Sequence, residues 1–404
     1  MLGILDDVKV IEVGDYLGGA FCAKLLADQG ADTLKIETPG KGDPSRHEPP
    51  FIGGIEHIEK SSVFLAYNTN KKSVTLNLGM DSGVQLFLRL IEDVDVIVDG
   101  FPVGYLESLG IGYQILKAKN AGLILTSVSP FGSTGPYKDY LSSDLIEQAM
   151  GGHLITGGDI DKEPMALPQD QAAVTCGRNG AIATAAALLY QRATGKGQQI
   201  DVSSMEAMVQ TPPGHIHQYS FTGNNAGRGG GGGQTSVMDS MHLETADGYV
   251  TLTTAGTGGV DAMDSWGEFL ELPEIQDPKF KTAGGRLQHL TELRELVVSK
   301  LKQWKSHDFF KAAMDKKFVV GVVQSPSDVV NCVHLGERDS YAVLTHPEIG
   351  SMKYPGVGFI TEHGNPTEGG KAAPLLGENT EAILSGKLGV PAAEIAALRA
   401  DGVI

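Results

Sequence analysis

The amino-terminal part of the chain alternates between short β-branched runs and segments with helical spacing. Val8–Val13 ends at Gly14 and is typical of a buried strand. Gly18–Gly30 spaces its apolar side chains as a helix does and closes on a glycine cap, and Thr33–Ile36 is a second β-branched run. This order predicts a βαβ unit at the start of a parallel sheet.

The same alternation continues to about residue 202. The further segments that we expect are strands at Ser73–Leu78, Val94–Val98, Leu123–Val128 and Gln199–Val202 and helices at Ser82–Glu92, Tyr105–Leu109 and Asn179–Gln191. The last of these helices is rich in alanine, which suits close packing against another element.

The pattern changes after Ala207. A glycine- and asparagine-rich stretch, Thr222–Gln234, is followed by segments that predict a second unit: a strand pair at Met241–Glu244 and Tyr249–Thr253, and helices at Ala262–Leu270, Leu287–Lys302 and Asp308–Asp315. Thr380–Ser385 and Ala392–Ala400 are again helical in pattern. We therefore expect an α/β protein with a large domain of residues 1–207 and 335–404 and a smaller α+β domain of residues 208–334.

The charge balance excludes some classes of function. The net charge is −17, from 49 acidic and 32 basic residues, which disfavours binding to nucleic acid or to an anionic membrane surface. The three cysteines lie far apart without CxxC spacing, so neither a disulfide framework nor a zinc site is predicted. The amino terminus lacks a basic region before an apolar run, and we expect a cytoplasmic protein.

Among familiar catalytic patterns, no GxSxG, HExxH or Walker sequence occurs. The turn after the first strand, Gly14–Gly19, resembles a dinucleotide-binding turn, and Glu37 stands where a ribose-binding acid would. However, GxGxxG is missing, and Tyr16 and Leu17 would crowd a pyrophosphate. A nicotinamide oxidoreductase is therefore only a distant alternative.

Several segments together resemble the class III CoA-transferases, the group of formyl-CoA transferase, carnitine CoA-transferase and α-methylacyl-CoA racemase. The segments are Leu5–Leu25, Ala31–Arg46, Asn68–Leu78, Leu109–Tyr113, Ser129–Pro136, Gln148–Gly152, Leu189–Val202 and Ala373–Asn379. They follow the family's order over nearly the whole chain. The resemblance implies a Rossmann-like large domain built from both chain ends, a smaller middle domain, and two subunits threaded through each other as an interlocked dimer.

The resemblance also implies a chemistry. In such enzymes an aspartate attacks an acyl-CoA thioester and passes through a mixed anhydride and an aspartyl-CoA thioester, from which an incoming carboxylate takes the CoA. A glycine-rich loop keeps water from the anhydride. The matching loop consists of Gly229, Gly230, Gly231, Gly232, Gly233 and Gln234. Its other interpretation is a plain linker.

The aspartate itself is missing. Counted back from Leu189 through the alanine-rich helix, its position falls near Ala173 or Val174, and neither side chain can form an anhydride. Asp170 is the nearest carboxylate, and a rearrangement of its loop could bring it into place as the nucleophile. Its other interpretation is a solvated loop acid.

The CoA-binding residues implied by the resemblance also depart from the family's pattern. Asp99-Gly100-Phe101 stands where Glu-Asn-Phe is common, and Ser108 where an arginine is common. We expect the CoA thioester, a substrate rather than a tightly bound cofactor, to contact five residues: Tyr16, Thr38, Lys71, Lys72 and Phe101. The role of the two lysines would be to pair with a phosphate, although surface lysines are the common alternative. No metal site is predicted.

Together these departures favour a non-catalytic subunit of a heteromeric transferase, a heterodimer or heterotetramer whose homologous partner supplies the aspartate. Two alternatives stay open: an active homodimeric transferase or acyl-CoA racemase that uses Asp170, and a binding or regulatory protein that kept the fold and lost catalysis.

Overall fold

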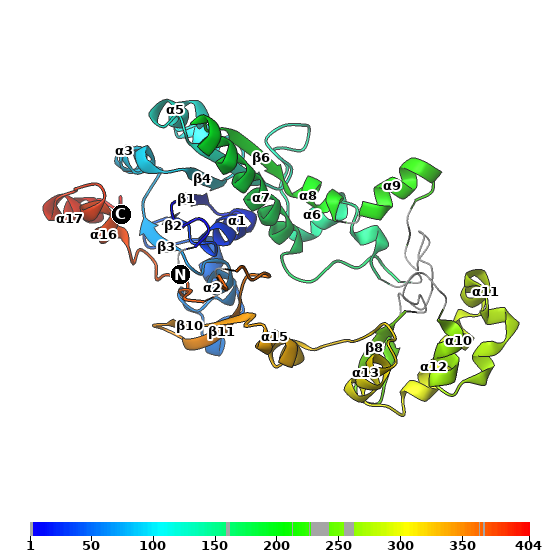
Figure 1. Ribbon diagram of the computed structural model, residues 1–404. Coiled ribbons are helices and arrows are strands. Elements are labelled where there is room, and N and C mark those ends of the chain that lie inside the picture. Colours follow the sequence, from blue (N-terminus) through cyan, green and yellow to red (C-terminus); the bar gives the residue numbers. More distant parts are fainter. Residues whose placement is uncertain are drawn as a thin grey trace. The chain divides into compact units, whose positions relative to one another are not determined.

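The computed structural model describes residues 3–158, 162–211, 213–225, 227, 242–253, 262–362, 364–366 and 368–404 (Figure 1). The chain divides into two compact units. Unit 1 comprises Met1–His153, Ala166–Pro212 and Val333–Ile404, and unit 2 comprises Leu154–Met165 and Pro213–Cys332. Residues 154–165, which the sequence pattern places in the large domain, thus group with unit 2.

Unit 1 is built on a six-stranded sheet with the order β3-β2-β1-β4-β5-β6, and every neighbouring pair is parallel. Its strands are β1 (Lys9–Gly14), β2 (Asp32–Glu37), β3 (Lys72–Thr75), β4 (Val96–Gly100), β5 (Ile124–Ser129) and β6 (Gln199–Ser203). The α/β fold expected from the sequence is confirmed. Parallel strands of this kind are buried on both faces by crossover helices.

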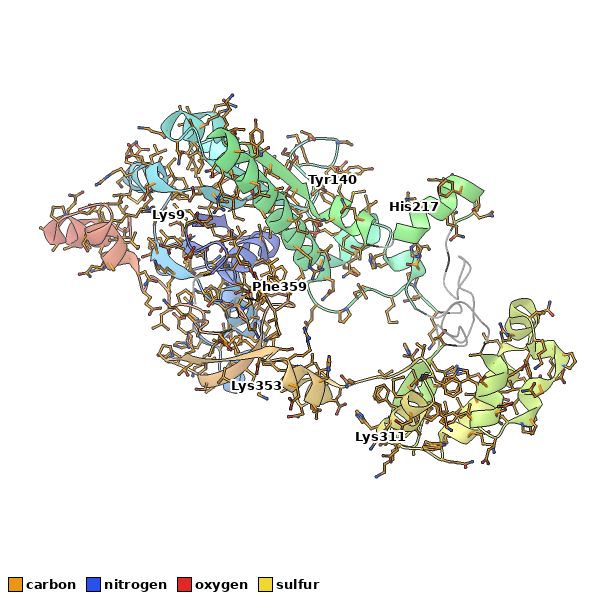
Figure 2. All side chains as sticks on the ribbon, in the orientation of Figure 1. Lys9, Tyr140, His217, Lys311, Lys353 and Phe359 are labelled. Atoms are coloured by element: carbon orange, nitrogen blue, oxygen red, sulfur yellow. The ribbon has the colours of Figure 1, made fainter. Side chains whose placement is uncertain are left out.

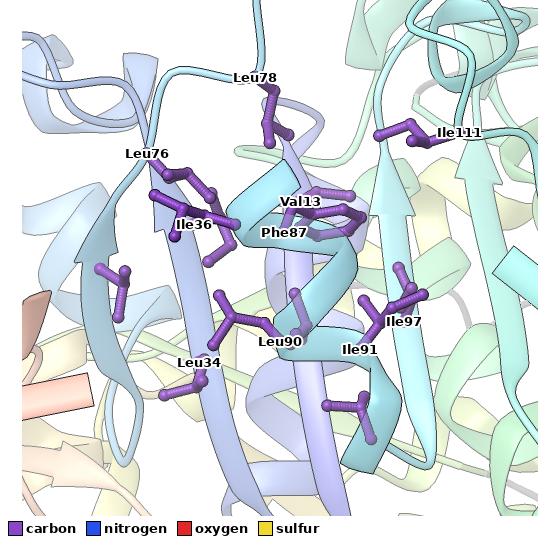
Figure 3. Packing of buried hydrophobic residues seen from close by; sticks show 14 of the residues in the cluster. Val13, Leu34, Ile36, Leu76, Leu78, Phe87, Leu90, Ile91, Ile97 and Ile111 are labelled. Atoms are coloured by element: carbon purple, nitrogen blue, oxygen red, sulfur yellow. The ribbon is translucent and has the colours of Figure 1, made fainter. Parts of the chain in front are cut away.

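Each strand sends alternate side chains to two separate cores. On one face, Val13 and Ile97 join a cluster with Phe87, Leu90 and Ile91 of the segment around α3 (Asp81–Leu90), as Figure 3 shows. On the other face, neighbouring strand residues pack against α1 (Leu17–Ala27) and α7 (Gln171–Thr194). The two layers of helices therefore follow from the period-2 pattern of the strands.

The remaining helices and strands of unit 1 are mostly short. They are α2 (Ser62–Tyr67), α4 (Tyr105–Ser108), α5 (Tyr113–Lys119), α6 (Asp144–Met150), α8 (Ser204–Gln210), α15 (Val333–Glu337), α16 (Thr380–Gly386), α17 (Ala392–Ala400) and the antiparallel hairpin of β10 (Tyr341–His346) and β11 (Gly350–Pro355). The sequence pattern did not predict α2, α5, α6, α8, α15 or the hairpin. Elements of one or two turns carry too few residues to establish a period.

The carboxyl-terminal segment completes the edge of this sheet. The backbone N–H of Ser73 donates to Oδ1 of Asn379 at 3.0 Å, and that of Thr75 donates to Oγ1 of Thr380 at 2.9 Å. Both residues belong to the edge strand β3, whose outer backbone groups would otherwise lack partners. Both ends of the chain therefore belong to unit 1.

Helices α1 and α7 are held unusually close by glycines. A Cβ atom at Gly177 of α7 would lie 2.5 Å from the carbonyl oxygen of Gly18 and 2.9 Å from the amide nitrogen of Cys22, both on α1. At Gly180 it would lie 3.1 Å from Sγ of Cys22. Only glycine fits at position 177, and a methyl at position 180 would press on Cys22, so the first turns of the two helices can meet.

We expect Gly177→Ala to lower the free energy of unfolding of unit 1 by ~1–3 kcal/mol, because the added methyl meets backbone atoms that cannot turn away. Gly336→Ala is the matched control, since a Cβ atom there meets nothing within 4 Å. Urea unfolding followed by far-UV circular dichroism measures both. Equal midpoints for the two variants would mean that α1 and α7 are not held at this distance.

Unit 2 combines a small sheet with helices. The sheet has the antiparallel order β7 (Leu243–Glu244), β8 (Tyr249–Leu252), β9 (Val320–Val322). Its helices are α9 (Pro213–Thr222), α10 (Met263–Phe269), α11 (Ala283–Gln288), α12 (Leu290–Leu301), α13 (Ser306–Asp315) and α14 (Pro326–Val330). Trp266 lies in the core, stacked on Phe318 at 4.0 Å between ring centroids. No described helix of either unit has the length and hydropathy required to cross a membrane.

Candidate functional site

The strand order reverses between β1 and β4, and this is where open α/β sheets bind ligands, beyond the carboxyl ends of the strands. Here β1 leads into Tyr16 and β4 leads into Phe101. The N–H of Tyr16 donates to the carbonyl oxygen of Gly100 at 3.0 Å, so the two connecting backbones touch. Gly14, with φ of 92°, and Gly100 permit this approach, because a Cβ atom at either would crowd the facing backbone.

Tyr16 is fixed at this switch point by a buried acid. Its phenol donates to Oε2 of Glu147 at 2.7 Å, and the hydroxyl of Ser204 donates to the same oxygen at 2.5 Å. Glu147 and Ser204 are 2% and 0% exposed. Burial, with the neighbouring Cys176 and Glu147, raises the pKa of Tyr16 well above its ordinary value. Because the phenol already donates its hydrogen bond inside the fold, a ligand would contact the ring of Tyr16.

Thr38 and Phe101 lie at the same edge of the sheet, after β2 and β4. Thr38 is exposed, and its carbonyl oxygen accepts the N–H groups of Lys41 and Gly42 in a tight turn. The Phe101 ring is partly buried and packs on Tyr105 with 4.6 Å between centroids. The structure thus brings together Tyr16, Thr38 and Phe101, three of the five residues predicted to contact CoA.

Lys71 is placed differently from the prediction. Its ammonium is fully buried, pairs with Oε2 of Glu12 at 2.6 Å, and donates to the carbonyl of Ala20 at 2.8 Å and to Oδ1 of Asn68 at 2.7 Å. Burial lowers the pKa of Lys71 to about 8, against the opposing effect of Glu12. All three donors are used inside the fold, so Lys71 is not available to a phosphate in this structure. No local pattern signals this, because its partners come from three different segments.

Lys72 is partly exposed, but it lies at the amino-terminal ends of the strands, away from the switch point. It is the first residue of β3 and pairs at 2.6 Å with Asp32, the first residue of β2. The crevice at the switch point is at the carboxyl ends of these strands. A contact between Lys72 and CoA stays a prediction that this position does not favour.

Glu37 is equally unavailable to a ribose. Its carboxylate is buried and accepts from Arg46 through both oxygens, at 2.7 and 3.0 Å, and from the hydroxyl of Ser73 at 2.5 Å. Arg46 also donates to Glu59 at 2.6 Å and to the carbonyl of Pro374 at 3.1 Å. This network joins the second strand to the carboxyl-terminal segment, and it removes the acid on which the nicotinamide alternative depended.

The position predicted for the nucleophile, near Ala173 or Val174, falls in the first turn of α7. This helix begins at Gln171, whereas the sequence pattern placed its start at Asn179, so Ala173 and Val174 are helical. Ala173 is buried, and its carbonyl oxygen lies 3.1 Å from where a Cβ atom of Gly18 would be, beside the ring of Tyr16. A carboxylate at this position would therefore lie next to the switch point and would face the free N–H groups at the start of the helix.

Asp170 occupies the cap position of α7 without making a side-chain cap. It is half-buried, and burial, reinforced by Asp144, raises its pKa. A carboxylate one turn before Ala173 is close to the correct place, but it precedes the helix instead of lying on it.

Two side chains of α6, missed in the sequence, fix the start of α7. Oδ1 of Asp144 accepts the N–H of Ala172 at 2.7 Å, and its other oxygen accepts from Gln148 at 2.5 Å. Gln148 also bonds both backbone groups of Leu167, at 2.9 and 3.1 Å. Asp144 thus supplies from another helix the capping oxygen that Asp170 does not provide.

Asp99, near the end of β4, is a further titratable group at this edge. It accepts the N–H of Phe101 at 2.9 Å and the hydroxyl of Ser127 at 3.3 Å. Burial nevertheless raises its pKa to about 7. The unusual Asp-Gly-Phe sequence was the signal that could have identified it.

We expect Asp99→Asn to stabilise unit 1 above pH 7 by ~2–4 kcal/mol. A carboxyl whose pKa is about 7 in the folded state and lower in the unfolded state stabilises the fold only while protonated, so this contribution is lost as pH rises from about 4 through 7. Asparagine keeps the acceptor oxygen and carries no charge. Urea unfolding at pH 5 and pH 8 measures the difference, with exposed Asp139→Asn as the control. An equal effect at both pH values would contradict the expectation.

The glycine loop, Gly229–Gly233 with Gln234, lies outside the described residues, so its role as a lid stays a prediction. Among the described residues, no group of three side chains is arranged to hold a metal ion.

Comparisons with known proteins agree with this geometry. A family model described as CoA-transferase family III matches residues 5–380. Succinyl-CoA–D-citramalate CoA-transferase of Chloroflexus aurantiacus is 32% identical over 99% of this chain and 98% of its own. The chain belongs to CoA-transferase family III.

This CoA-transferase is also similar to a further relative and to a solved structure. A subunit of succinyl-CoA:(R)-benzylsuccinate CoA-transferase from Thauera aromatica is 28% identical over 98% of each chain. The crystal structure of a CAIB/BAIF family protein from Brucella suis superposes with a TM-score of 0.83 at 27% identity, covering 95% of this chain and 99% of that one. The fold and family expected from the sequence are both confirmed, and CoA thioesters are the substrates of this family of transferases.

Proposed function

We propose that this chain is the non-catalytic subunit of a heteromeric class III CoA-transferase. One observation carries the proposal: the first turn of α7, beside the switch point, holds Ala173 where an attacking carboxylate is needed. An alanine methyl cannot form the acyl anhydride on which transfer depends. A homologous partner subunit supplies the aspartate.

The proposed donor is succinyl-CoA, and the acceptor is a carboxylic acid such as benzylsuccinate. Both relatives described above are named for succinyl-CoA, and one of them is named as a subunit of a benzylsuccinate enzyme. Burial raises the pKa of Asp99, near the crevice, to about 7, and its negative charge above that pH would oppose the phosphates of CoA. The aspartate-bearing subunit therefore binds the reacting thioester, and this chain completes the assembly.

Two threaded subunits would share an interface well above ~2,000 Å². Unit 1 exposes apolar side chains that a partner could cover, among them Leu141 of the segment before α6, and Leu145 and Ile146 on α6. Tyr140, labelled in Figure 2, is exposed in the same segment as Leu141. Without its partner the chain should be poorly soluble or self-paired. A stable monomer at micromolar concentration would count against this assembly.

A second candidate, the active homodimer that uses Asp170, has one observation in its favour. Asp170 lies at the start of α7, half-buried and with its pKa raised by burial and by Asp144. It nevertheless lies outside the helical turn that contains Ala173, and a rearrangement of the segment would be needed to move it.

The test is reconstitution. The purified chain, the aspartate-bearing homologous subunit and the co-expressed complex are each given succinyl-CoA with a panel of carboxylic acids, and new CoA thioesters are quantified by chromatography. We expect turnover by the complex and none by this chain alone, because the chain lacks a nucleophile. Turnover by a homogeneous preparation of this chain alone would refute the proposal.

A further inference from the structure

A cluster of charged side chains lies at the amino-terminal ends of the strands of unit 1, on the opposite edge of the sheet from the switch point. Lys387 follows α16, which packs against β3 (Figure 1). Lys9 begins β1, and Asp32 and Lys72 begin β2 and β3. Together with Asp93, these residues form what we call the amino-edge cluster, because the other four are the charged groups that act on the ammonium of Lys387.

Two of the three lysines in the amino-edge cluster are held by carboxylates. Nζ of Lys72 pairs with Oδ1 of Asp32 at 2.6 Å, and Nζ of Lys9 pairs with Asp93. The hydrogen bond to Asp93 raises the pKa of Lys9. These two amines are therefore kept in ion pairs at the edge of the sheet.

Lys387 is the third lysine and differs from the other two. Its side chain is exposed, and its Nζ makes neither a hydrogen bond nor an ion pair with any residue that the structure describes. Burial of part of the side chain lowers the pKa of Lys387, and the other two lysines add to this effect against the opposing charges of both aspartates. The amine of Lys387 is thus both accessible and free of a partner.

The backbone holds Lys387 in this position. Its N–H donates to the carbonyl oxygen of Ile383 at 2.9 Å and closes the last turn of α16. The carbonyl oxygen of the next residue, Leu388, accepts from Nη2 of Arg89 at 2.5 Å, and the Leu388 side chain packs against the hydrophobic core. The amine therefore reaches solvent from a fixed point.

We infer that Lys387 is a site of covalent acylation by CoA thioesters, the substrate class of this family. The unprotonated amine attacks the carbonyl carbon of the thioester, as lysine nucleophiles do once they have lost their proton. A C–N bond forms, the C–S bond breaks, and the thiolate of CoA leaves and takes up the proton that the nitrogen releases. The products are an amide and free CoA, and no other reactant is needed.

Acylation by a dicarboxylic thioester reverses the charge at this position. Succinyl-CoA would convert the ammonium of Lys387 into an amide that carries a carboxylate, which would then lie among the carboxylates of Asp32 and Asp93. The inference goes beyond the proposed function, because it requires only the thioester and does not depend on which subunit carries the catalytic aspartate.

The experiment measures acylation at each lysine of the purified full-length chain. The chain is incubated at pH 8 with isotopically labelled succinyl-CoA, then denatured, and its remaining lysines are capped with unlabelled succinic anhydride. The isotope ratio at each lysine, measured by mass spectrometry, gives its occupancy. We expect Lys387 to react at least about fivefold faster than Lys9 or Lys72, whose amines are held by aspartates. Lys119, exposed on α5, is the reference for an ordinary surface lysine, and equal rates at Lys387 and Lys119 would overturn the inference.

Two variants test the physical reason for this selectivity. In Asp93→Asn, Lys9 should be acylated at least about fivefold faster than in the wild-type chain, because its carboxylate partner is lost. Lys387→Arg keeps the positive charge, and it should remove the label at position 387 while leaving the rate at Lys9 unchanged. Circular dichroism verifies that both variants fold. An unchanged rate at Lys9 in Asp93→Asn would contradict the inference, since ion pairing would then not control which amine reacts.

Discussion

Turnover of the complex is expected to fall by ~10⁴-fold or more when the partner subunit's catalytic aspartate is changed to asparagine, and to stay within about twofold in Asp170→Asn of this chain. The first change removes the group that forms the covalent intermediate. The second changes a half-buried acid whose side chain makes no capping hydrogen bond to α7. The difference in turnover between the two variants distinguishes the proposed non-catalytic subunit from an active homodimer that uses Asp170.

Covalent trapping shows directly which chain reacts. The complex is incubated with succinyl-CoA and hydroxylamine, and the hydroxamate formed from an acylated or thioesterified aspartate is located by mass spectrometry. We expect the label on the partner subunit. Asp139→Asn in this chain, a change at an exposed carboxylate, is the control. A hydroxamate on Asp170 would restore the ordinary homodimeric enzyme and refute the proposal.

Arg46→Met is expected to lower the free energy of unfolding of unit 1 by ~3–5 kcal/mol. The guanidinium is 0% exposed, bonds the carboxylates of Glu37 and Glu59, and lies 3.6 Å over the ring of Phe64. Methionine keeps the aliphatic stem but leaves two carboxylates inside the fold without their cation. One of them, Glu37, retains only the N–H of Asp43 and the hydroxyl of Ser73.

The matched control is Arg192→Met, because Arg192 pairs with Asp7 at the exposed surface, where such pairs contribute under ~1 kcal/mol. Unfolding of unit 1 is followed by circular dichroism. Both tryptophans of the chain, Trp266 and Trp304, belong to unit 2, so fluorescence reports that unit separately. Equal loss of stability in Arg46→Met and Arg192→Met would mean that the buried network does not stabilise unit 1.

The candidate site was only partly predictable from the sequence. Tyr16 and Phe101 were named from the resemblance to the CoA-transferases, and both lie at the switch point because each follows a strand of the parallel sheet. The burial of Lys71, predicted to contact a phosphate, could not be predicted, since its partners Glu12, Ala20 and Asn68 lie in three segments that meet only in the fold. The start of α7 was placed too late, because its capping acceptor, Asp144, comes from another helix.

Three features were determined by the sequence itself: the alternation of strands and helices that predicts a parallel sheet, the family, and the presence of alanine instead of aspartate at position 173. Each of these is recorded locally, in the period of apolar residues or in the identity of a side chain at a counted position. The tertiary structure alone decided which charged side chains are buried in ion pairs and which face of α7 is exposed. Those outcomes depend on contacts between distant segments: Arg46 reaches the carbonyl of Pro374, and burial brings the pKa of Asp99 to about 7. Burial and pairing are properties of the assembled sheet and its two helix layers, and no local pattern encodes them.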